Sequence, residues 1–252
     1  NVYDRGITIP ANMTDMFPLD IVGKTMLNLA KKVYTEVNAS ATAEQLAKNF
    51  NANAVTQDAS GTPNWVVYTA ASDEIVDKLA EAAVQLDDGD IANGVQSFPI
   101  EGRIAVWRAS AKGVFEVGNF KAQDMLAMGT VSPESVPNTI DNGFFGVLFS
   151  VPQYFMATQI WSLVESYLGL TAGDLDEVLG YFAHSLGTAR AMAFSSTIKV
   201  IDEPNGQGVR VQPKYRWGHE TWFPLSVVPI VTNSFTNPSY PGSVVTPLVV
   251  IP

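Results

Sequence analysis

The 252-residue sequence contains no cysteine and few charged residues. Without cysteine the chain can form no disulfide, no thiolate zinc site and no cysteine nucleophile. Charged residues make up 16% of the chain and hydrophobic residues 46%, whereas about a quarter of the residues of a typical soluble protein are charged. Because a soluble monomer ordinarily covers itself with charge, this deficit predicts that much of the surface faces other protein.

Histidine and clustered metal ligands are also scarce. The two histidines, His184 and His219, show no ligand spacing. Asp87, Asp88 and Asp90 could hold a hard cation, but they lack the full calcium-loop pattern, and we expect a solvated turn there. The sequence therefore predicts neither a metal nor another cofactor.

A membrane-spanning segment is not predicted either. The uncharged run 142–164 is interrupted by Pro152 and diluted by polar residues, whereas a span needs about 20 predominantly apolar residues. We expect a buried strand that leads into a buried helix.

Apolar residues at three- and four-residue steps predict helices over much of the first 200 residues. The expected ranges are 19–37, 42–50, 73–86 and 119–128, together with two apolar helices within 153–196 that are hinged at residues 169–171. We expect the rest of the chain to wrap around this last pair, because both helices carry large apolar faces.

Short β-prone runs predict two hairpins and one isolated strand. The first hairpin joins residues 103–109 and 114–117, the second joins 197–201 and 209–217 across a loop that contains Asn205-Gly206, and the strand covers 65–69. The predicted fold class is α+β, with a helix-rich core, two β-hairpins and an extended Pro-rich C-terminal tail.

Three parts are expected along the chain: an N-terminal arm (1–18), a single core domain (19–220) and an extended tail (221–252). The tail contains no charged residue, and prolines occupy positions 224, 229, 238, 241, 247 and 252. Repeated proline prevents a helix and allows only edge strands or extended chain. We expect the arm and the tail to bind copies of the same chain.

The segment from Tyr181 to Gly187 resembles the nucleophile elbow of α/β-hydrolases, which exposes a serine at a strand-to-helix turn. Asp202 and His219 follow Ser185 in the order of that family, so the resemblance implies a serine hydrolase that uses these three residues. Position 183 is alanine where the motif has glycine, and the preceding residues have helical spacing. We therefore predict that Ser185 lies in a helix, close to backbone carbonyls, and is not a nucleophile.

Basic residues are concentrated in the two β-rich segments, whereas 14 of the 25 acidic residues precede residue 102. Strand alternation places Arg210, Lys214 and Arg216 on one face, with apolar residues on the other. The candidate contact residues are Arg210, Lys214, Arg216, Arg103 and Arg108. Their partner is either the phosphates of RNA or DNA or the acidic half of a neighbouring subunit, and the alternative is an ordinary solvated face. The net charge of −10 opposes nucleic acid at long range.

Four observations converge on a structural subunit of a large homo-oligomeric assembly: low charge density, arms at both ends, an uncharged tail, and separated acidic and basic segments. We predict a viral coat or nucleocapsid protein located in the virion, and not an enzyme. A non-viral surface or filament protein would show the same signs, and a serine hydrolase is the competing class.

Overall fold

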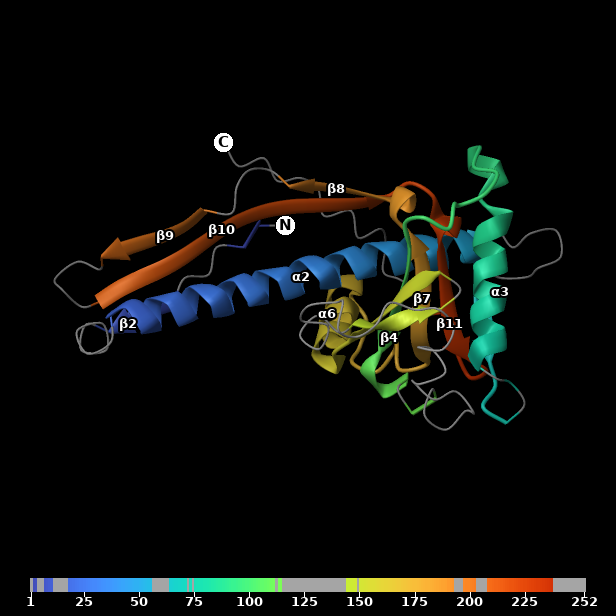
Figure 1. Ribbon diagram of the computed structural model, residues 1–252, viewed down its shortest axis with the longest axis horizontal. Helices are drawn as coiled ribbons and strands as arrows, with labels where there is room; N and C mark the ends of the chain where they lie inside the picture. Colours follow the sequence, from blue (N-terminus) through green and yellow to red (C-terminus); the bar gives the residue numbers. More distant parts are fainter. Residues whose placement is uncertain are drawn as a thin grey trace. The chain divides into compact units, whose positions relative to one another are not determined.

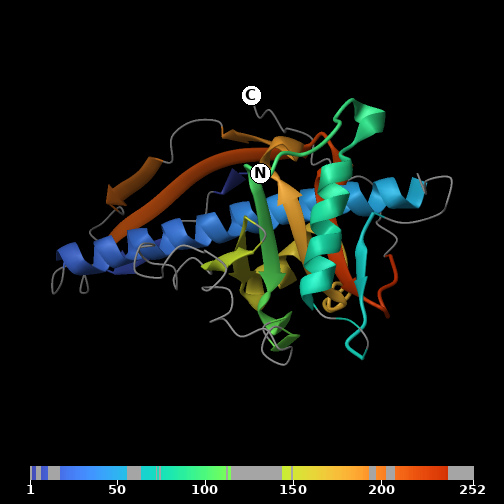
Figure 2. The same cartoon turned by 45° about the vertical axis from the view of Figure 1, so that its right-hand side comes forward.

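The computed structural model describes residues 2–3, 7–10, 18–55, 64–71, 73, 75–111, 113–114, 144–148, 150–192, 197–202 and 208–237. The chain divides into two compact units (Figures 1 and 2). The first unit comprises residues 1–41, 190–219 and 245–252, and the second comprises 42–189 and 220–244. Helix α2 (Pro18–Val55) and strand β10 (Gly208–Thr221) each contribute residues to both units.

The first unit is built on a β-ribbon and the first part of α2. Strand β9 (Thr197–Asp202) pairs antiparallel with β10, which confirms the second predicted hairpin. Strands β1 (Val2–Tyr3) and β2 (Ile7–Pro10) also pair antiparallel with β10, and β8 (Thr188–Met192) joins the same sheet. The N-terminal arm was predicted to lack regular structure, but where it is described it forms strands on its own chain. Residues 11–17 lie outside the described residues.

Alternate residues of β10 pack against α2. Val211 is fully buried in a cluster with Ile9 and Leu29. Trp217 packs against α2 further along the strand, and its indole Nε1 donates a hydrogen bond of 2.8 Å to the Ser40 hydroxyl. The predicted alternation is therefore correct at these two apolar positions.

The second unit is organised on a six-stranded mixed sheet in the order β3-β11-β7-β4-β6-β5. These strands are β3 (Val66–Tyr68), β11 (Val227–Thr232), β7 (Val178–His184), β4 (Arg103–Arg108), β6 (Val151–Met156) and β5 (Phe144–Leu148). Only the β3–β11 and β4–β6 pairs are parallel. Helices α3 (Ile75–Asp88) and α6 (Thr158–Leu168) lie on opposite sides of this sheet (Figure 1).

The main core lies between α3 and the central strands. Ile75, Leu79, Ala82 and Leu86 form the buried face of α3, as the helical spacing predicted for this segment. They pack on a cluster that includes Trp107 of β4 and Phe182 of β7. Short 3-10 helices connect the elements: η1 (Ile91–Asn93), η2 (Ala109–Ala111), η4 (Ser185–Gly187) and η6 (Pro224–Ser226).

The prediction of two hinged helices over residues 153–196 is wrong. The segment predicted as the first helix consists of strand β6 followed by the shorter helix α6. This order agrees with the buried strand and buried helix expected for the uncharged run. The second is not a helix, because β7, η4 and β8 occupy that segment. All seven residues of β7 are buried between β4 and β11. A strand covered on both faces is apolar at consecutive positions, so periodicity alone cannot distinguish it from a buried helix.

Other predicted boundaries also change. The helices predicted over 19–37 and 42–50 form the single helix α2, whereas the strand predicted over 65–69 is confirmed as β3. The first predicted hairpin is wrong, because β4 pairs with β6 and β7 and residues 113–114 are helical. Residues 115–117 and the helix predicted over 119–128 lie outside the described residues.

The predicted C-terminal tail belongs largely to the core where it is described. Strand β11 lies between β3 and β7, and Val227, Val228, Ile230 and Val231 are fully buried. Pro229 lies within this strand, beside an irregularity in the pairing between residues 230 and 231; proline in a sheet is tolerated at such bulges. Residues 221–232 therefore do not form a free docking arm, and residues 238–252 lie outside the described residues.

The predicted α+β class is confirmed, but the core is organised on a mixed sheet and is not helix-rich. Within the described residues, no helix combines the length and the apolarity that crossing a bilayer requires.

Candidate assembly surfaces

Basic residues occupy register positions on one face of the β9–β10 hairpin. In its register Arg210 pairs with Ile201, position 212 pairs with Lys199, and position 214 pairs with Thr197. Because directly paired residues of an antiparallel ladder share a face, Lys199 and Ile201 belong to the same face as positions 210, 212 and 214. Both Arg210 and Ile201 are exposed, Ile201 by 42%. We call this surface the hairpin face.

The predicted contact residues Arg210, Lys214 and Arg216 thus occupy alternate positions on one face of β10. Positions 210 and 214 pair with β9, whereas position 216 pairs with Val2 of β1. The sequence prediction did not assign Lys199 to this face. Lys199 and Ile201 are two positions apart, so strand alternation places them on one face of β9. Only the hairpin register shows that this face is also the face of Arg210.

Charge is divided unequally between the two units. The first unit contains nine basic and six acidic residues and so carries +3, whereas the second contains six basic and 19 acidic residues and carries −13. The subunit is therefore electrostatically bipolar. At long range the first unit of one copy attracts the second unit of another copy, whereas two first units or two second units repel each other.

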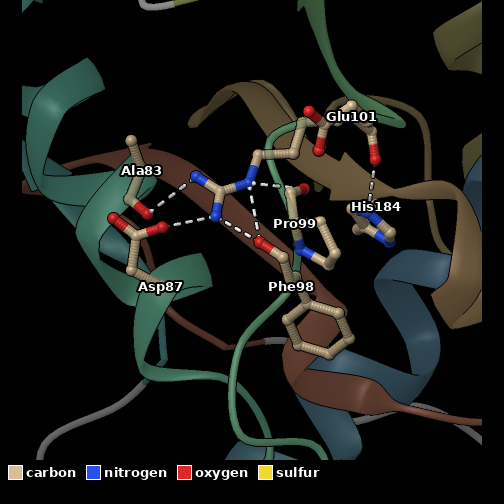
Figure 3. A network of polar contacts seen from close by, with 7 residues as sticks. Ala83, Asp87, Phe98, Pro99, Glu101 and His184 are labelled. Atoms are coloured by element: carbon tan, nitrogen blue, oxygen red, sulfur yellow. Dashed lines mark hydrogen bonds and ion pairs between the residues drawn. The ribbon is translucent and has the colours of Figure 1, made fainter.

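Arg103 was predicted to lie at a contact surface but is buried, with an exposed fraction of 3%. Its guanidinium donates hydrogen bonds to the carbonyl oxygens of Phe98, Pro99 and Ala83, and it pairs with the Asp87 carboxylate (Figure 3). Arg103 therefore ties helix α3 to the loop that precedes β4.

Arg108, also predicted as a contact residue, is 4% exposed. Its Nη1 donates to Asp176 Oδ1 at 2.5 Å, and its Nη2 lies 3.6 Å from Glu165 Oε1. The guanidinium carbon lies 5.1 Å from the centre of the Trp161 ring, which is within cation–π range. Both arginines are thus paired inside their own unit, because β4 is a central strand with both faces covered. The prediction that they form a surface contact is not supported by these positions.

His219, on β10, is partly buried, and this burial, together with the nearby Arg190 cation, lowers the pKa of its imidazole below 6.5. A hydrogen bond with the Val37 backbone opposes the shift. The folded chain therefore keeps His219 neutral under conditions in which the unfolded chain binds a proton.

We expect the free energy of unfolding to decrease as the pH falls below about 6.5, because the unfolded state then binds more protons than the folded state. Glu44 acts in the opposite direction, since burial raises the pKa of its carboxyl. The measurement is therefore a comparison of His219→Gln with the wild type by denaturant unfolding at about pH 7.5 and about pH 5.5. The variant should lose less stability on acidification, and an equal loss would contradict the assignment.

The residues of the hydrolase resemblance do not form one site within a unit. Ser185 lies in the second unit, whereas Asp202 and His219 lie in the first. Ser185 is exposed in η4, and the predicted helix around it is absent, because β7 leads through η4 into the strand β8. The strand-to-helix context that defines a nucleophile elbow is therefore missing at this turn.

The acidic residues that follow α3 have different partners. Asp87 pairs with Arg103, and both carboxylate oxygens of Asp90 accept hydrogen bonds of 2.9 Å from the Asn93 side chain. Among the residues that the structure describes, no group of three or more histidine or carboxylate side chains is placed to hold a metal.

The sequence matches no protein-family model and no curated protein. Solved bacteriophage capsid structures nevertheless share its fold. The capsid of Ralstonia phage GP4 matches with a TM-score of 0.56 and 10% identity over 91% of this chain and 72% of the other. The acid-stable capsid of the Helicobacter pylori bacteriophage KHP30 matches with a TM-score of 0.54 and 9% identity, covering 92% and 73% of the two chains. The mature capsid of bacteriophage PhiM1 gives 0.52 and 10%, covering 94% and 72%.

The matches extend over nearly the whole chain. The long helix, the β-ribbon and the six-stranded mixed sheet with flanking helices together are consistent with the HK97 capsid fold. The chain therefore has the fold of bacteriophage capsid proteins.

Proposed function

We propose that this chain is the major capsid protein of a virus and that its copies assemble into the closed shell of the virion. The observation that carries the proposal is the likeness to phage capsid structures over more than nine tenths of the chain. The low charge density and the bipolar charge distribution support the same role, because both suit a chain whose surface meets other copies of itself. The role is structural and requires no catalytic residue.

Particle mass in solution tests this proposal. The purified chain has a mass of 27.2 kDa, so a monomer and a closed shell differ in mass by orders of magnitude. Light scattering coupled to size-exclusion chromatography should detect particles under assembly conditions. A chain that stays monomeric or dimeric across a wide range of concentration, salt and pH would contradict the proposal.

Within the shell, the strip formed by Arg210, Lys214 and Arg216 is proposed to contact the acidic surface of a neighbouring subunit. The second unit carries a charge of −13, whereas the first carries +3. At long range the second unit of a neighbouring subunit therefore attracts the basic strip, and the first unit does not. Nucleic-acid phosphates are the alternative partner, and the chain's net charge of −10 opposes them.

The triple substitution of Arg210, Lys214 and Arg216 by glutamine separates the two partners. A subunit contact predicts fewer particles, with the loss greatest at low salt, where the charged contact is least screened in the wild type. A nucleic-acid contact predicts intact particles that have lost co-purifying nucleic acid. The affinity for single-stranded nucleic acid should also depend less on salt: the slope of log affinity against log salt concentration should become shallower by about 0.7 for each phosphate contact removed. If neither property changes, the strip is only solvated.

A further inference from the structure

Three turns meet at one end of the six-stranded sheet. Because β7 runs antiparallel to both of its neighbours, its last residues lie beside the first residues of β4 and β11. The turns at this end are residues 97–102, 185–187 and 222–226. Backbone hydrogen bonds join them, from Ser185 N to Gly102 O at 2.9 Å and from Trp222 N to Gly187 O at 2.8 Å.

Each of these turns exposes one large apolar side chain. The exposed fractions are 51% for Ile100, 62% for Leu186 and 61% for Trp222. Single exposed apolar residues are common on soluble proteins, but a group on adjoining turns marks an interaction site. Tryptophan is also enriched among the residues that contribute most to binding at protein interfaces. We call these three residues the turn surface.

Buried polar groups hold the turn surface in place. Arg103 binds the carbonyl groups of the first turn, as described above. His184 connects the first two turns, because its Nδ1 accepts from Leu186 N at 3.1 Å and its Nε2 lies 2.9 Å from Glu101 O (Figure 3). A carbonyl oxygen only accepts, so Nε2 carries the ring proton. A surface fixed in this way loses little conformational entropy when a partner binds.

The rim of the turn surface is acidic. Glu101 and Glu220 are exposed beside Ile100 and Trp222. The only basic side chain within these turns and the residues that flank them, apart from His184, is Arg103, which is buried. This rim repels phosphates and anionic lipids, and it attracts a basic protein surface.

We propose that the turn surface of one subunit binds the hairpin face of a second copy of this chain. The hairpin face provides the matching chemistry, since it places the exposed apolar Ile201 directly opposite the exposed cation Arg210. In this contact Ile201 meets the apolar turn residues, and Arg210 faces the acidic rim. The contact joins unlike surfaces, so it can be repeated around a ring of subunits. It rests on the proposed function, because it specifies one of the contacts that hold the shell together.

A charge exchange tests this pairing. Glu101→Arg and Arg210→Glu should each raise the concentration required for assembly by about tenfold, which corresponds to about 1.4 kcal/mol. Combining the two substitutions in one chain should restore assembly to within about threefold of the wild type, because the opposite charges then face each other again. Trp222→Ser should reduce assembly at least as much as either single reversal. Val84→Ser is the matched control, because Val84 is 55% exposed on α3 and lies outside the turn surface.

The possible failures are distinguishable. If the wild type assembles and Trp222→Ser behaves like Val84→Ser, the turn surface is not an interface. If Trp222→Ser prevents assembly but the double charge exchange restores nothing, the partner is not the hairpin face, and the proposed pairing is wrong. If the wild type itself forms no particles, the proposed function fails, and this contact fails with it. Thermal unfolding of each variant shows whether the subunit fold has been kept.

Discussion

Replacing Gly180 with alanine is expected to destabilise the second unit by about 3 kcal/mol, at the upper end of the range for overpacked cores. Gly180 lies in β7, where a Cβ atom would be 2.5 Å from the Val106 carbonyl oxygen and 2.7 Å from the Trp107 ring. The first of these atoms is backbone, so relief requires β4 and β7 to separate. Such a movement would disrupt a ladder that runs from Arg103 to Trp107.

Denaturant unfolding measures this effect. The control is Gly218→Ala, because Gly218 also lies in a strand but a Cβ there would meet nothing within 4 Å. The control should change stability by no more than about 0.5 kcal/mol. Equal stability of the two variants would show that β4 and β7 are not in the close contact described here.

Removing the Arg108 side chain is expected to cost about 3–5 kcal/mol, because it leaves a buried carboxylate without its cation. Glu165 is 3% exposed, and its Oε1 also accepts hydrogen bonds from the backbone N–H groups of Gly173 and Leu175. Arg108→Ala therefore disturbs a charged group that positions the turn before β7. The double substitution Arg108→Met with Glu165→Met should recover much of the loss, since it removes both charges and preserves most of the volume.

Asp176 offers the matched control for this prediction. It binds the same guanidinium, but its side chain is 70% exposed, so Asp176→Ala should cost no more than about 1 kcal/mol. Denaturant unfolding of the three variants provides the comparison. A loss below about 1 kcal/mol for Arg108→Ala, or an equal loss for Asp176→Ala, would contradict the structural role of the buried pair.

Elements with one buried face were predictable from the sequence. The face of α3 follows from the helical spacing of Ile75, Leu79 and Leu86. The β9–β10 hairpin follows from strand alternation, because Val211 is buried against α2 while Arg210 is exposed. In both cases a single periodicity separates the core side from the solvent side.

Elements buried on both faces were not predictable in the same way. Strand β7 has no charged or strongly polar residue before His184, and the small residues Gly180 and Ala183 made it look like a closely packed helix. Strand β11 contains Pro229, which suggested an extended tail. This proline lies one position before the pairing with β3 begins at Ile230, and close to an irregularity in the pairing with β7. In such strands the arrangement is decided by neighbours that are remote in the sequence, which local patterns do not reveal.

The sequence could place some candidate contact residues and not others, because it shows local patterns but not contacts between remote elements. Arg210 could be placed on a face from its own strand. Arg103 and Arg108 could not, because their partners Asp87, Glu165 and Asp176 come from other elements. The turn surface has no sequence signal at all, since Ile100, Leu186 and Trp222 are brought together only by the sheet.

Electron cryomicroscopy of the purified, assembled chain is the decisive test of the proposed closed shell. We expect hollow, symmetric particles whose wall is made of subunits with the two units described here. Their density should show the turn surface of one subunit against the hairpin face of another. Preparations that contain only monomers or small oligomers under all assembly conditions would contradict the claim, as would ordered particles whose wall cannot accommodate this fold.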